Sequence, residues 1–423
     1  MPLTICLFED SKLKNFLPLS QLRPVYALRA GIVPLYMKCR RYFNDADITL
    51  ACREQLARFL ADSEKNYPVN IIKKGGADIL FLNGRIRDYG DLPKLVGESR
   101  ISTLYQNNGE VVGILLKNDA VRDMSEVATP LDYQQHLEKE GGNIPDFDTS
   151  ATLYNYVWEI MGDIDREIRA DIDSLKETLT GPHGARIHDG AFWVAQDEIY
   201  LGNDVEVMPG AVIDASGGPI YIGGNCRIEP HAAIFGPAYI GPNSTVVAGK
   251  ITACSIGHTC RVGGEIEHSV FHSYVNKYHA GFIGHSYVGS WVNFGAMTTN
   301  SDLKNNYSNI KVTVNGTTVD TGSNKVGSFI GDHTKFGIGT LLTTGINIGV
   351  CCNIFGGLLV SDKEIPPFSW GTTGSFVPYD FRKALETAEV VTERRGYKMN
   401  NAEIAMLQAV AESTTSDKGV LNL

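Results

Sequence analysis

The feature that most constrains this chain is an aliphatic residue that recurs at intervals of six between about positions 199 and 370. Glycine often follows it, and a small side chain stands four positions later. Examples are Ile222 with Cys226, Ile228 with Ala232, Ile240 with Ser244, Ile256 with Cys260, Ile330 with Thr334, Phe336 with Thr340 and Ile348 with Cys352. A six-residue period is too short for a helical repeat and is typical of parallel β-helices, whose coils must stack to bury their apolar faces. The sequence therefore predicts a left-handed parallel β-helix from Ile199 to Trp370.

Two segments, 264–281 and 300–327, lose this period. In the second, β-branched residues alternate around Asn315-Gly316, which predicts a two-residue type I′ hairpin. We expect this hairpin to project from the solenoid as an arm. Beyond Trp370, the segments 384–395 and 402–412 are predicted to be helices that cap the open end of the solenoid.

The first 150 residues predict a separate α/β domain, because 423 residues exceed what one hydrophobic core usually holds. Short apolar runs predict strands, and one polar segment has helical spacing. The expected strands are 4–8, 69–72, 77–82 and 111–116, and the expected helix is 48–62. This order favours a mainly parallel sheet.

An amphipathic linker helix is expected within residues 151–185. Apolar residues at steps of three and four form one stripe, and the charged residues between them are expected to face water. The stripe is Tyr154, Trp158, Met161, Ile164, Ile168 and Ile172, and the charged residues are Asp163, Asp165, Arg166, Glu167 and Arg169. The β-helix domain then occupies 186–371, and the helical cap and tail occupy 372–423.

Composition excludes several classes of function. The net charge of -10 argues against nucleic acid as a partner. No apolar run reaches about 18 residues, so no membrane span is expected, and the N-terminus does not read as a secretory signal. The eight cysteines form no C-x-x-C pair and no metal-ligand spacing. We therefore expect a reduced, cytoplasmic protein without a metal site.

The run from His279 to Gly284, followed by Val292–Ala296 and Thr298–Asp302, resembles bacterial bifunctional enzymes of sugar-nucleotide synthesis. These combine glucosamine-1-phosphate acetyltransferase and N-acetylglucosamine-1-phosphate uridyltransferase domains. The resemblance implies acetyl-CoA as acyl donor, glucosamine 1-phosphate as acceptor and a homotrimer. It also implies His279 as the catalytic residue and a set of substrate-binding residues, which are Lys250, Lys277, Phe282, Asn293, Asn300 and Asp302.

Two positions depart from that family. Phe282 stands where the family has tyrosine and so lacks a hydroxyl for the substrate phosphate, and the family's upstream lysine falls near Glu267 or His268. Lys250 and Lys277 are the candidates to supply that charge. Chemically, an imidazole with an ordinary pKa near 6.5 suits His279 as the general base of acyl transfer. A structural histidine and a metal ligand are the alternative interpretations of His279.

The N-terminal segment Leu17–Ser20, followed by Arg23-Pro24, resembles the nucleotide-binding start of sugar nucleotidyltransferases. The resemblance implies a UTP site with Mg²⁺. The candidate nucleotide-binding residues are Lys12, Arg23, Arg29, Lys38 and Arg85. Several family positions differ, since Ser11 and Leu13 replace glycines, Val25 replaces a lysine and Arg85 replaces the Mg²⁺-binding aspartate. Asp88 and Asp91 are the only carboxylates expected near Arg85.

Three functions remain open from the sequence. The chain is either a bifunctional acyltransferase and nucleotidyltransferase, or an acyltransferase with a degenerate N-terminal domain. The third possibility is a non-catalytic trimeric scaffold or sugar-nucleotide sensor.

Overall fold

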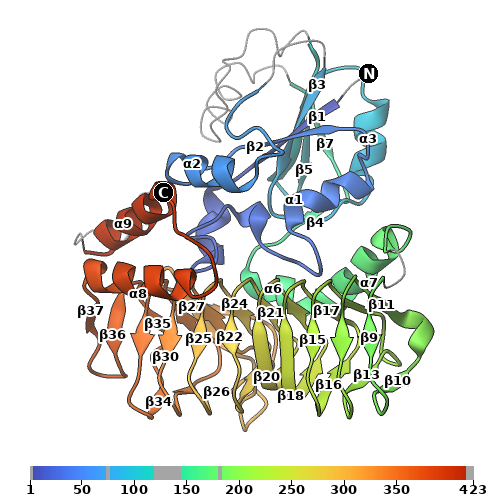
Figure 1. Ribbon diagram of the computed structural model, residues 1–423. Helices are drawn as coiled ribbons and strands as arrows, with labels where there is room; N and C mark the ends of the chain where they lie inside the picture. The colour runs from blue at the N-terminus through green and yellow to red at the C-terminus, as the bar shows by residue number, and fades with distance from the viewer. Residues whose placement is uncertain (1–2, 73–76, 119–143, 180–182, 416–423) are drawn as a thin grey trace.

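The computed structural model describes residues 3–72, 77–118, 144–179 and 183–415. Figure 1 shows an N-terminal α/β domain that lies along one side of a long β-solenoid. Two helices, α6 (Val157–Gly162) and α7 (Ile164–Leu175), lie between these two parts. The predicted combination of an α/β domain and a parallel β-helix is therefore confirmed.

The N-terminal domain has a six-stranded sheet with the order β2-β1-β3-β6-β5-β7. Its strands are β1 (Leu3–Phe8), β2 (Asp47–Leu50), β3 (Asp78–Asn83), β5 (Thr103–Asn107), β6 (Glu110–Leu116) and β7 (Asp146–Asp148). β1 pairs in parallel with β2 and β3, whereas β6 runs antiparallel to both β3 and β5. The sheet is thus mixed, and its antiparallel part is a hairpin with Asn108-Gly109 at the turn, both at positive φ.

The expected helix over 48–62 is wrong in its first turn. Residues 47–50 form β2, because Ile48 and Leu50 are buried beside β1, and the helix α2 begins only at Glu54 and ends at Ser63. The expected strand at 69–72 is reduced to isolated bridges at Val69, which pairs with Leu50, and at Ile71. Smaller elements complete the domain: η1 (Ser11–Phe16), η2 (Val25–Ala27), α1 (Leu35–Lys38), η3 (Cys39–Arg41), β4 (Ile86–Asp88), α3 (Leu92–Glu98) and β8 (Thr152–Leu153).

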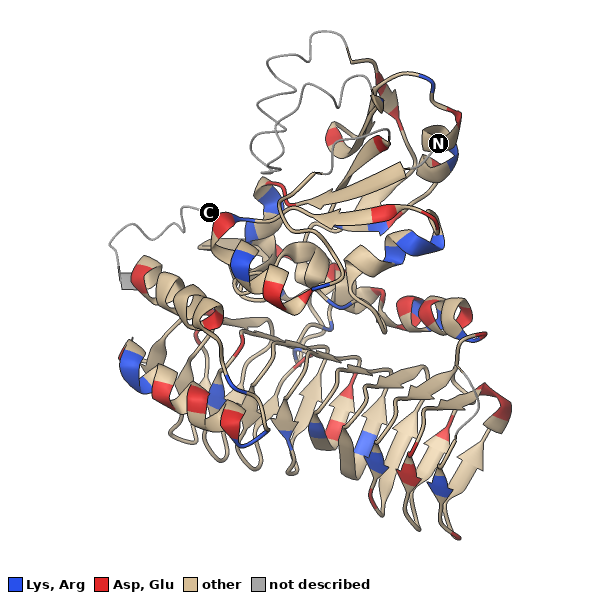
Figure 2. Ribbon diagram, turned by 45° about the horizontal axis from the view of Figure 1, so that its top comes forward, with Lys and Arg blue, Asp and Glu red and all other residues tan. Residues whose placement is uncertain are grey.

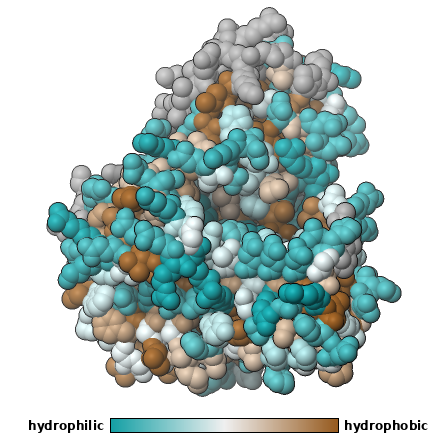
Figure 3. Space-filling view, in the orientation of Figure 1, coloured by the Kyte–Doolittle hydropathy of each residue, from teal (hydrophilic) through white to brown (hydrophobic). Residues whose placement is uncertain are grey.

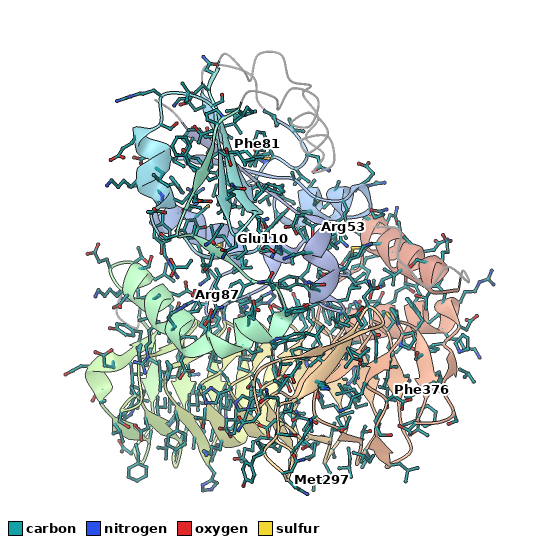
Figure 4. All side chains as sticks on the ribbon, turned by 180° about the vertical axis from the view of Figure 1, so that it is seen from behind. Arg53, Phe81, Arg87, Glu110, Met297 and Phe376 are labelled. Atoms are coloured by element: carbon teal, nitrogen blue, oxygen red, sulfur yellow. The ribbon has the colours of Figure 1, made fainter. Side chains whose placement is uncertain are left out.

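The linker helix is only partly solvated on its polar side, since Arg166 and Arg169 are exposed as expected but other charged residues are not. It is split at Asp163 into α6 and α7, and Asp163, Glu167 and Asp171 are all buried. Asp163 pairs with Arg87, which Figure 4 shows near these helices, and Glu167 and Asp171 pair with Lys38. These three carboxylates are covered because the helices are enclosed between the domain and the solenoid, so they need cationic partners.

The solenoid stacks parallel strands on its sides. One sheet consists of β11 (Ile199–Leu201), β14 (Ile220–Ile222), β17 (Ala238–Ile240), β19 (Ser255–Ile256), β21 (Val270–Phe271), β24 (Tyr287–Val288), β29 (Ser328–Ile330), β32 (Ile346–Ile348) and β35 (Glu364–Ile365). Within it Ile222, Ile240 and Ile256 lie in register on successive coils, and all are fully buried. The predicted inward ladder of aliphatic side chains is therefore confirmed, and the cysteines at the small-residue position are buried as well.

The second sheet follows the other sides of the coils. Its main path is β10 (Phe192–Val194), β13 (Val212–Asp214), β16 (Ala232–Phe235), β18 (Thr245–Thr252), β20 (Arg261–Glu267), β22 (Asn276–Lys277), β25 (Asn293–Phe294), β30 (Lys335–Phe336), β33 (Asn353–Ile354), β36 (Ser369–Gly371) and β37 (Val377–Pro378). Joined to this path are β9 (Arg186–Ile187), β12 (Glu206–Val207), β15 (Arg227–Ile228) and β23 (Phe282–Gly284). A short third sheet contains β26 (Thr299–Asn300), β31 (Leu341–Leu342) and β34 (Leu359–Val360).

The expected break at 264–281 is wrong, since β20, β21 and β22 continue the stack there. The period is hidden because Lys277, in register with Val262, occupies an inward position that is otherwise apolar.

The second interruption does contain the predicted hairpin, β27 (Lys311–Val314) and β28 (Thr317–Asp320). Asn315 and Gly316 both have positive φ, as a type I′ turn requires. The hairpin is not a projecting arm, however, because Val312 and Val314 are buried and β27 packs on β32 and η1.

The C-terminal helices are α8 (Phe381–Glu393) and α9 (Asn401–Thr415), close to the predicted ranges. α9 packs against α2 of the N-terminal domain, and α8 lies on the solenoid (Figure 1). One apolar core connects the domain, the linker helices, the outer side of the solenoid and these helices, whereas a second core fills the coils. Within the described residues, no helix is long and apolar enough to cross a membrane.

Candidate functional site

The predicted catalytic residue His279 lies at an exposed corner of the solenoid. β22 ends at Lys277, and the exposed residues Tyr278, His279 and Ala280 lead into β23. The imidazole lies edge-on to the Tyr278 ring at 5.6 Å, and its nitrogens form no hydrogen bond with any described residue. A side chain in this position is accessible to a ligand or to another copy of the chain.

Lys277 holds this corner from inside the coil. Its side chain is buried, and its Nζ donates hydrogen bonds to the carbonyl oxygens of Gly263, at 3.2 Å, and His279. Burial lowers the pKa of Lys277 to about 8. The structure thus turns this predicted substrate ligand inward, where it fixes the backbone beside His279.

Two asparagines lie on the outer face that leads to the corner. Asn276 Nδ2 donates to Asn293 Oδ1 at 2.8 Å, from the neighbouring coil. Beyond the corner, Lys250, Glu265 and Phe282 lie side by side in register on three successive strands. Lys250 is exposed and lies 3.9 Å from Glu265. The chain therefore places the predicted residues Asn293, Lys250 and Phe282 on the two faces that meet at His279.

Asn300 and Asp302 make internal contacts. Asn300 is buried and exchanges hydrogen bonds with the backbone of Gly284, through Oδ1 at 2.8 Å and Nδ2 at 3.0 Å. Asp302 Oδ2 lies 2.7 Å from Nδ1 of His285. Burial favours the neutral form of Asp302, but the hydrogen bond and charge of His285 prevail and lower its pKa. His285, which the repeat pattern would direct into solvent, is instead paired with Asp302 and stacked on His268.

Lys12 and Arg85 meet at the carboxyl ends of β1 and β3, the edge at which open α/β sheets bind ligands. Arg85 is buried and binds Asp10 through Nε at 2.9 Å and through Nη2, while Lys12 pairs with Glu110. Asn83 also donates to Asp10, at 2.9 Å. Asp10 and Glu110 were missed from the sequence, and the position of Asp10 directly after β1 was the available signal. The expected neighbours of Arg85, Asp88 and Asp91, are not the carboxylates that bind it.

The other three predicted nucleotide-binding cations do not join this cluster. Arg23 forms an ion pair with Asp332 of the solenoid, and Lys38 pairs with Glu167 and Asp171 of α7. The Arg29 guanidinium donates to the carbonyl of Ile32, and its backbone N–H donates to the Tyr287 hydroxyl of the solenoid at 2.8 Å. These cations join the N-terminal domain to the linker helix and the solenoid.

A cavity of about 370 Å³ lies where the domain, the solenoid and α9 meet. It is lined by Arg23, His258, His272 and His333, among others. Burial lowers the pKa of His272 and His333 far below the ordinary value, which makes both imidazoles neutral. The sequence gives no sign of this cavity, because its walls come from two distant parts of the chain, residues 22–64 and residues 258–407. The hollow between the two parts is visible in Figure 3.

The residues of the N-terminal cluster do not fit a Mg²⁺ site. In the described ranges no group of three or more histidine, cysteine, aspartate or glutamate side chains is placed to hold a metal ion. Asp10 and Glu110, the carboxylates nearest to Arg85, are already neutralised by Arg85 and Lys12. A divalent cation would have to displace both of these cations.

Comparison with known proteins supports the two-part architecture. Residues 5–180, which include α6 and α7, match the family model described as sugar nucleotidyl transferase. A bifunctional sugar-1-phosphate nucleotidylyltransferase/acetyltransferase of Sulfurisphaera tokodaii is 33% identical over 97 residues, which cover 23% of this chain and 24% of that protein. The bifunctional protein GlmU of Methanococcus vannielii is 25% identical over 243 residues, with coverages of 50% and 55%. These matches confirm the resemblance seen in the sequence.

Among solved structures, a UDP-N-acetylglucosamine acyltransferase from Campylobacter jejuni covers 53% of this chain and 95% of its own at 14% identity, with a TM-score of 0.30. The chain spans between about a quarter and a little over half of the length of the curated relatives named above. By fold, it combines a sugar nucleotidyl transferase-type domain with a hexapeptide β-helix. The curated relatives that it matches are bifunctional proteins, and the one from Sulfurisphaera is named as a nucleotidylyltransferase and acetyltransferase.

Proposed function

We propose that this chain is an acyltransferase that moves an acetyl group from acetyl-CoA to the amine of an amino-sugar phosphate, with glucosamine 1-phosphate as the acceptor. His279 is the general base. The observation that carries the proposal is the corner itself, where an exposed imidazole that forms no hydrogen bond with any described residue stands on a backbone held by the buried Lys277.

The reaction assigns one proton transfer to His279. The acceptor amine attacks the thioester carbonyl, so that a C–N bond forms and the C–S bond then breaks. His279 takes the proton that the amine loses and returns it to the departing sulfur, which leaves as the thiol of coenzyme A. Backbone N–H groups of the coil stabilise the oxyanion that develops on the carbonyl.

We assign substrate contacts to the residues on the two faces beside His279. Asn293, paired with Asn276, offers amide groups to the sugar, and the exposed Lys250 offers a positive charge to the phosphate. Phe282 provides apolar contact on the same face as Lys250. Asn300 and Asp302 position the backbone and His285 on the neighbouring coil, because their polar atoms are used within the fold.

The test is release of coenzyme A from acetyl-CoA by the purified chain, with and without glucosamine 1-phosphate. We expect release that depends on the amino-sugar phosphate and is absent with glucose 1-phosphate, which has no amine. Release that is equal with both sugars would contradict transfer to an amine. No release with a range of amino-sugar phosphates would favour the non-catalytic scaffold.

Nucleotidyl transfer by the N-terminal domain is the second candidate, since residues 5–180 match the sugar nucleotidyl transferase family. The pairing of Lys12 and Arg85 with carboxylates favours a domain that no longer catalyses this reaction. Pyrophosphate release from UTP with N-acetylglucosamine 1-phosphate and Mg²⁺ tests it. If the wild type releases pyrophosphate and Arg85→Ala does not, the chain is a bifunctional enzyme. If the wild type releases no pyrophosphate, acyl transfer is its only proposed activity.

A further inference from the structure

A second cleft, of about 370 Å³, lies between the C-terminal end of α8 and the outer face of β22, β25 and β30. Four basic residues line it: Arg261, Lys335, Arg394 and Arg395. They come from three separate parts of the chain, so their meeting is produced by the fold. Figure 2 shows basic residues at both ends of α8, with acidic residues between them.

None of these four cations forms an ion pair with a described carboxylate, although the charge of Asp332 acts on Lys335 from a greater distance. Within the described part of the chain, no carboxylate lies within 4.0 Å of any of them. Lys335 Nζ donates only to the carbonyl of Trp291, at 2.6 Å. Burial, followed by the charges of Arg261 and Arg394, lowers the pKa of Arg395. This cluster therefore differs from Arg23, Lys38 and Arg85, which the fold pairs with carboxylates.

Uncompensated positive charge at close range opposes folding, and a site that binds an anion is a usual reason for keeping it. Arg394 and Arg395 gain some stabilisation from the carbonyl end of their own helix, which ends at Glu393. Arg261 and Lys335 belong to the solenoid and gain nothing from that helix end. The helix dipole can therefore offset the charge of Arg394 and Arg395, but not that of Arg261 and Lys335.

The walls of the cleft add groups that suit a polar ligand. Asn276 and Asn293 lie on its floor, and Tyr274 and Trp291 form a stacked pair at 3.8 Å on one side. Guanidinium groups bind phosphate oxygens through paired N–H donors, which a bare charge does not offer. We propose that this cleft is a binding site for the phosphate groups of a small molecule, held by Arg261, Arg394 and Arg395 with Lys335 at its base.

The test is the change in melting temperature, together with calorimetric binding, when inorganic pyrophosphate is added to the full chain in a phosphate-free buffer. Sodium chloride at the same ionic strength is the reference. We expect pyrophosphate to raise the melting temperature and chloride not to do so. Arg261→Gln and Arg395→Gln should each weaken pyrophosphate binding by about 10-fold or more, as expected for the loss of a charge-assisted hydrogen bond.

Arg382→Gln is the matched control, because Arg382 is exposed on the same helix outside the cleft. It should bind pyrophosphate like the wild type. Without ligand, Arg395→Gln should melt at a higher temperature than the wild type, since one repelling charge is removed. Wild-type binding no tighter than that of the Arg261→Gln/Arg395→Gln double variant would overturn the proposal, and so would an Arg395→Gln protein that is destabilised and binds unchanged.

Sugar nucleotides and coenzyme A are two classes of small molecule that carry such phosphates. Titrations with UDP and with coenzyme A distinguish them, and the tighter of the two identifies the source. These experiments measure binding and not catalysis, so they test the phosphate site independently of acyl transfer at His279. Equal affinity of both compounds for the wild type and the double variant would exclude the cleft as their phosphate site.

Discussion

The ammonium group of Lys277 donates a hydrogen bond to the backbone carbonyl of His279, two residues further along the chain. The lysine occupies a position that the apolar residues Val262 and Phe294 fill in the adjacent coils, and it is 1% exposed. A buried amine is unfavourable unless its donors are satisfied, and here they hold two carbonyl oxygens of the corner. The proposed general base is thus set on a backbone that the core of the solenoid fixes.

Lys277→Met tests this positioning role. The apolar side chain fits the coil but cannot bind the two carbonyls, so we expect the corner to loosen while the chain stays folded. Turnover in acetyl transfer should fall by roughly 10-fold or more, because misplacement of a catalytic group slows the chemical step. The Michaelis constant for acetyl-CoA should change little, as steady-state kinetics would show. Turnover equal to that of the wild type would mean that the hydrogen bond has no part in catalysis.

The same substitution should alter the pH dependence of stability. Burial lowers the pKa of Lys277 to about 8 from 10.5 in the folded chain. Between these two values the unfolded chain carries a proton that the folded chain has lost, so the free energy of unfolding rises with pH across this window. One such group contributes at most about 1.4 kcal/mol per pH unit.

Urea denaturation of the wild type and Lys277→Met between pH 8 and 10 measures this contribution. The rise in stability should be smaller in the variant, whereas Lys38 and Lys335, whose pKa values are also lowered to about 8, titrate in both proteins. Identical slopes for the two proteins would show that Lys277 is not buried as an amine.

Arg23→Ala should destabilise the junction between the domain and the solenoid. Arg23 and Asp332 form an ion pair with side chains only 12% and 6% exposed, so removing one partner leaves the other buried and unpaired. Such a loss typically costs about 3–5 kcal/mol. A double-mutant cycle with Asp332→Ala, followed by chemical denaturation, isolates the pair. Strictly additive effects of the two substitutions would show that the residues do not interact.

We predict that the protein is a homotrimer. Large apolar side chains are exposed along one edge of the solenoid, where Figure 4 places Met297; they include Ile338, Leu358 and Leu359. The backbone N–H of Met297 donates to Ala280, next to His279, so a second chain on this edge would border the proposed site. Exposed apolar surface of this kind marks an interface, and cyclic symmetry is the usual assembly.

Light scattering at micromolar concentration measures the mass. The wild type should have the mass of three chains, and Leu359→Asp should shift it towards one chain without loss of secondary structure. A wild-type mass of one chain would contradict the prediction.

The solenoid was predictable because the regular spacing of apolar residues such as Ile222, Ile240 and Ile256 places them in register inside successive coils. The type I′ turn was also predictable, since Asn-Gly has a strong local preference. The same signal at Asn108-Gly109 was overlooked, and the hairpin of β5 and β6 was missed with it. Local patterns thus carry most of the fold.

What the sequence did not reveal depends on partners that are distant in the chain. From the sequence, Glu167 is expected to face solvent, but in the structure it pairs with Lys38. Likewise Arg85 is expected to be free to bind a nucleotide, but it pairs with Asp10 and lies near Glu110. Lys277 looks like a substrate ligand until the coil turns it inward. Charges of this kind are assigned only once the tertiary structure shows whether they are already paired.

The cluster of Lys12 and Arg85 in the N-terminal domain is well separated from the His279 corner. Figure 4 places Glu110, which pairs with Lys12, in the N-terminal domain, and places Met297, which adjoins the His279 corner, at the far edge of the solenoid. Substitutions at one site are therefore expected to leave the other unaffected.

The most direct test compares the rate at which wild type and His279→Ala form N-acetylated sugar phosphate from acetyl-CoA and glucosamine 1-phosphate. His231→Ala is the control, because His231 is exposed at another corner of the same solenoid. We expect His279→Ala to lose about 10²–10⁴-fold in turnover, with little change in the Michaelis constant for acetyl-CoA. His231→Ala should match the wild type. Product formation by His279→Ala at the wild-type rate would contradict the assignment of His279 as the general base.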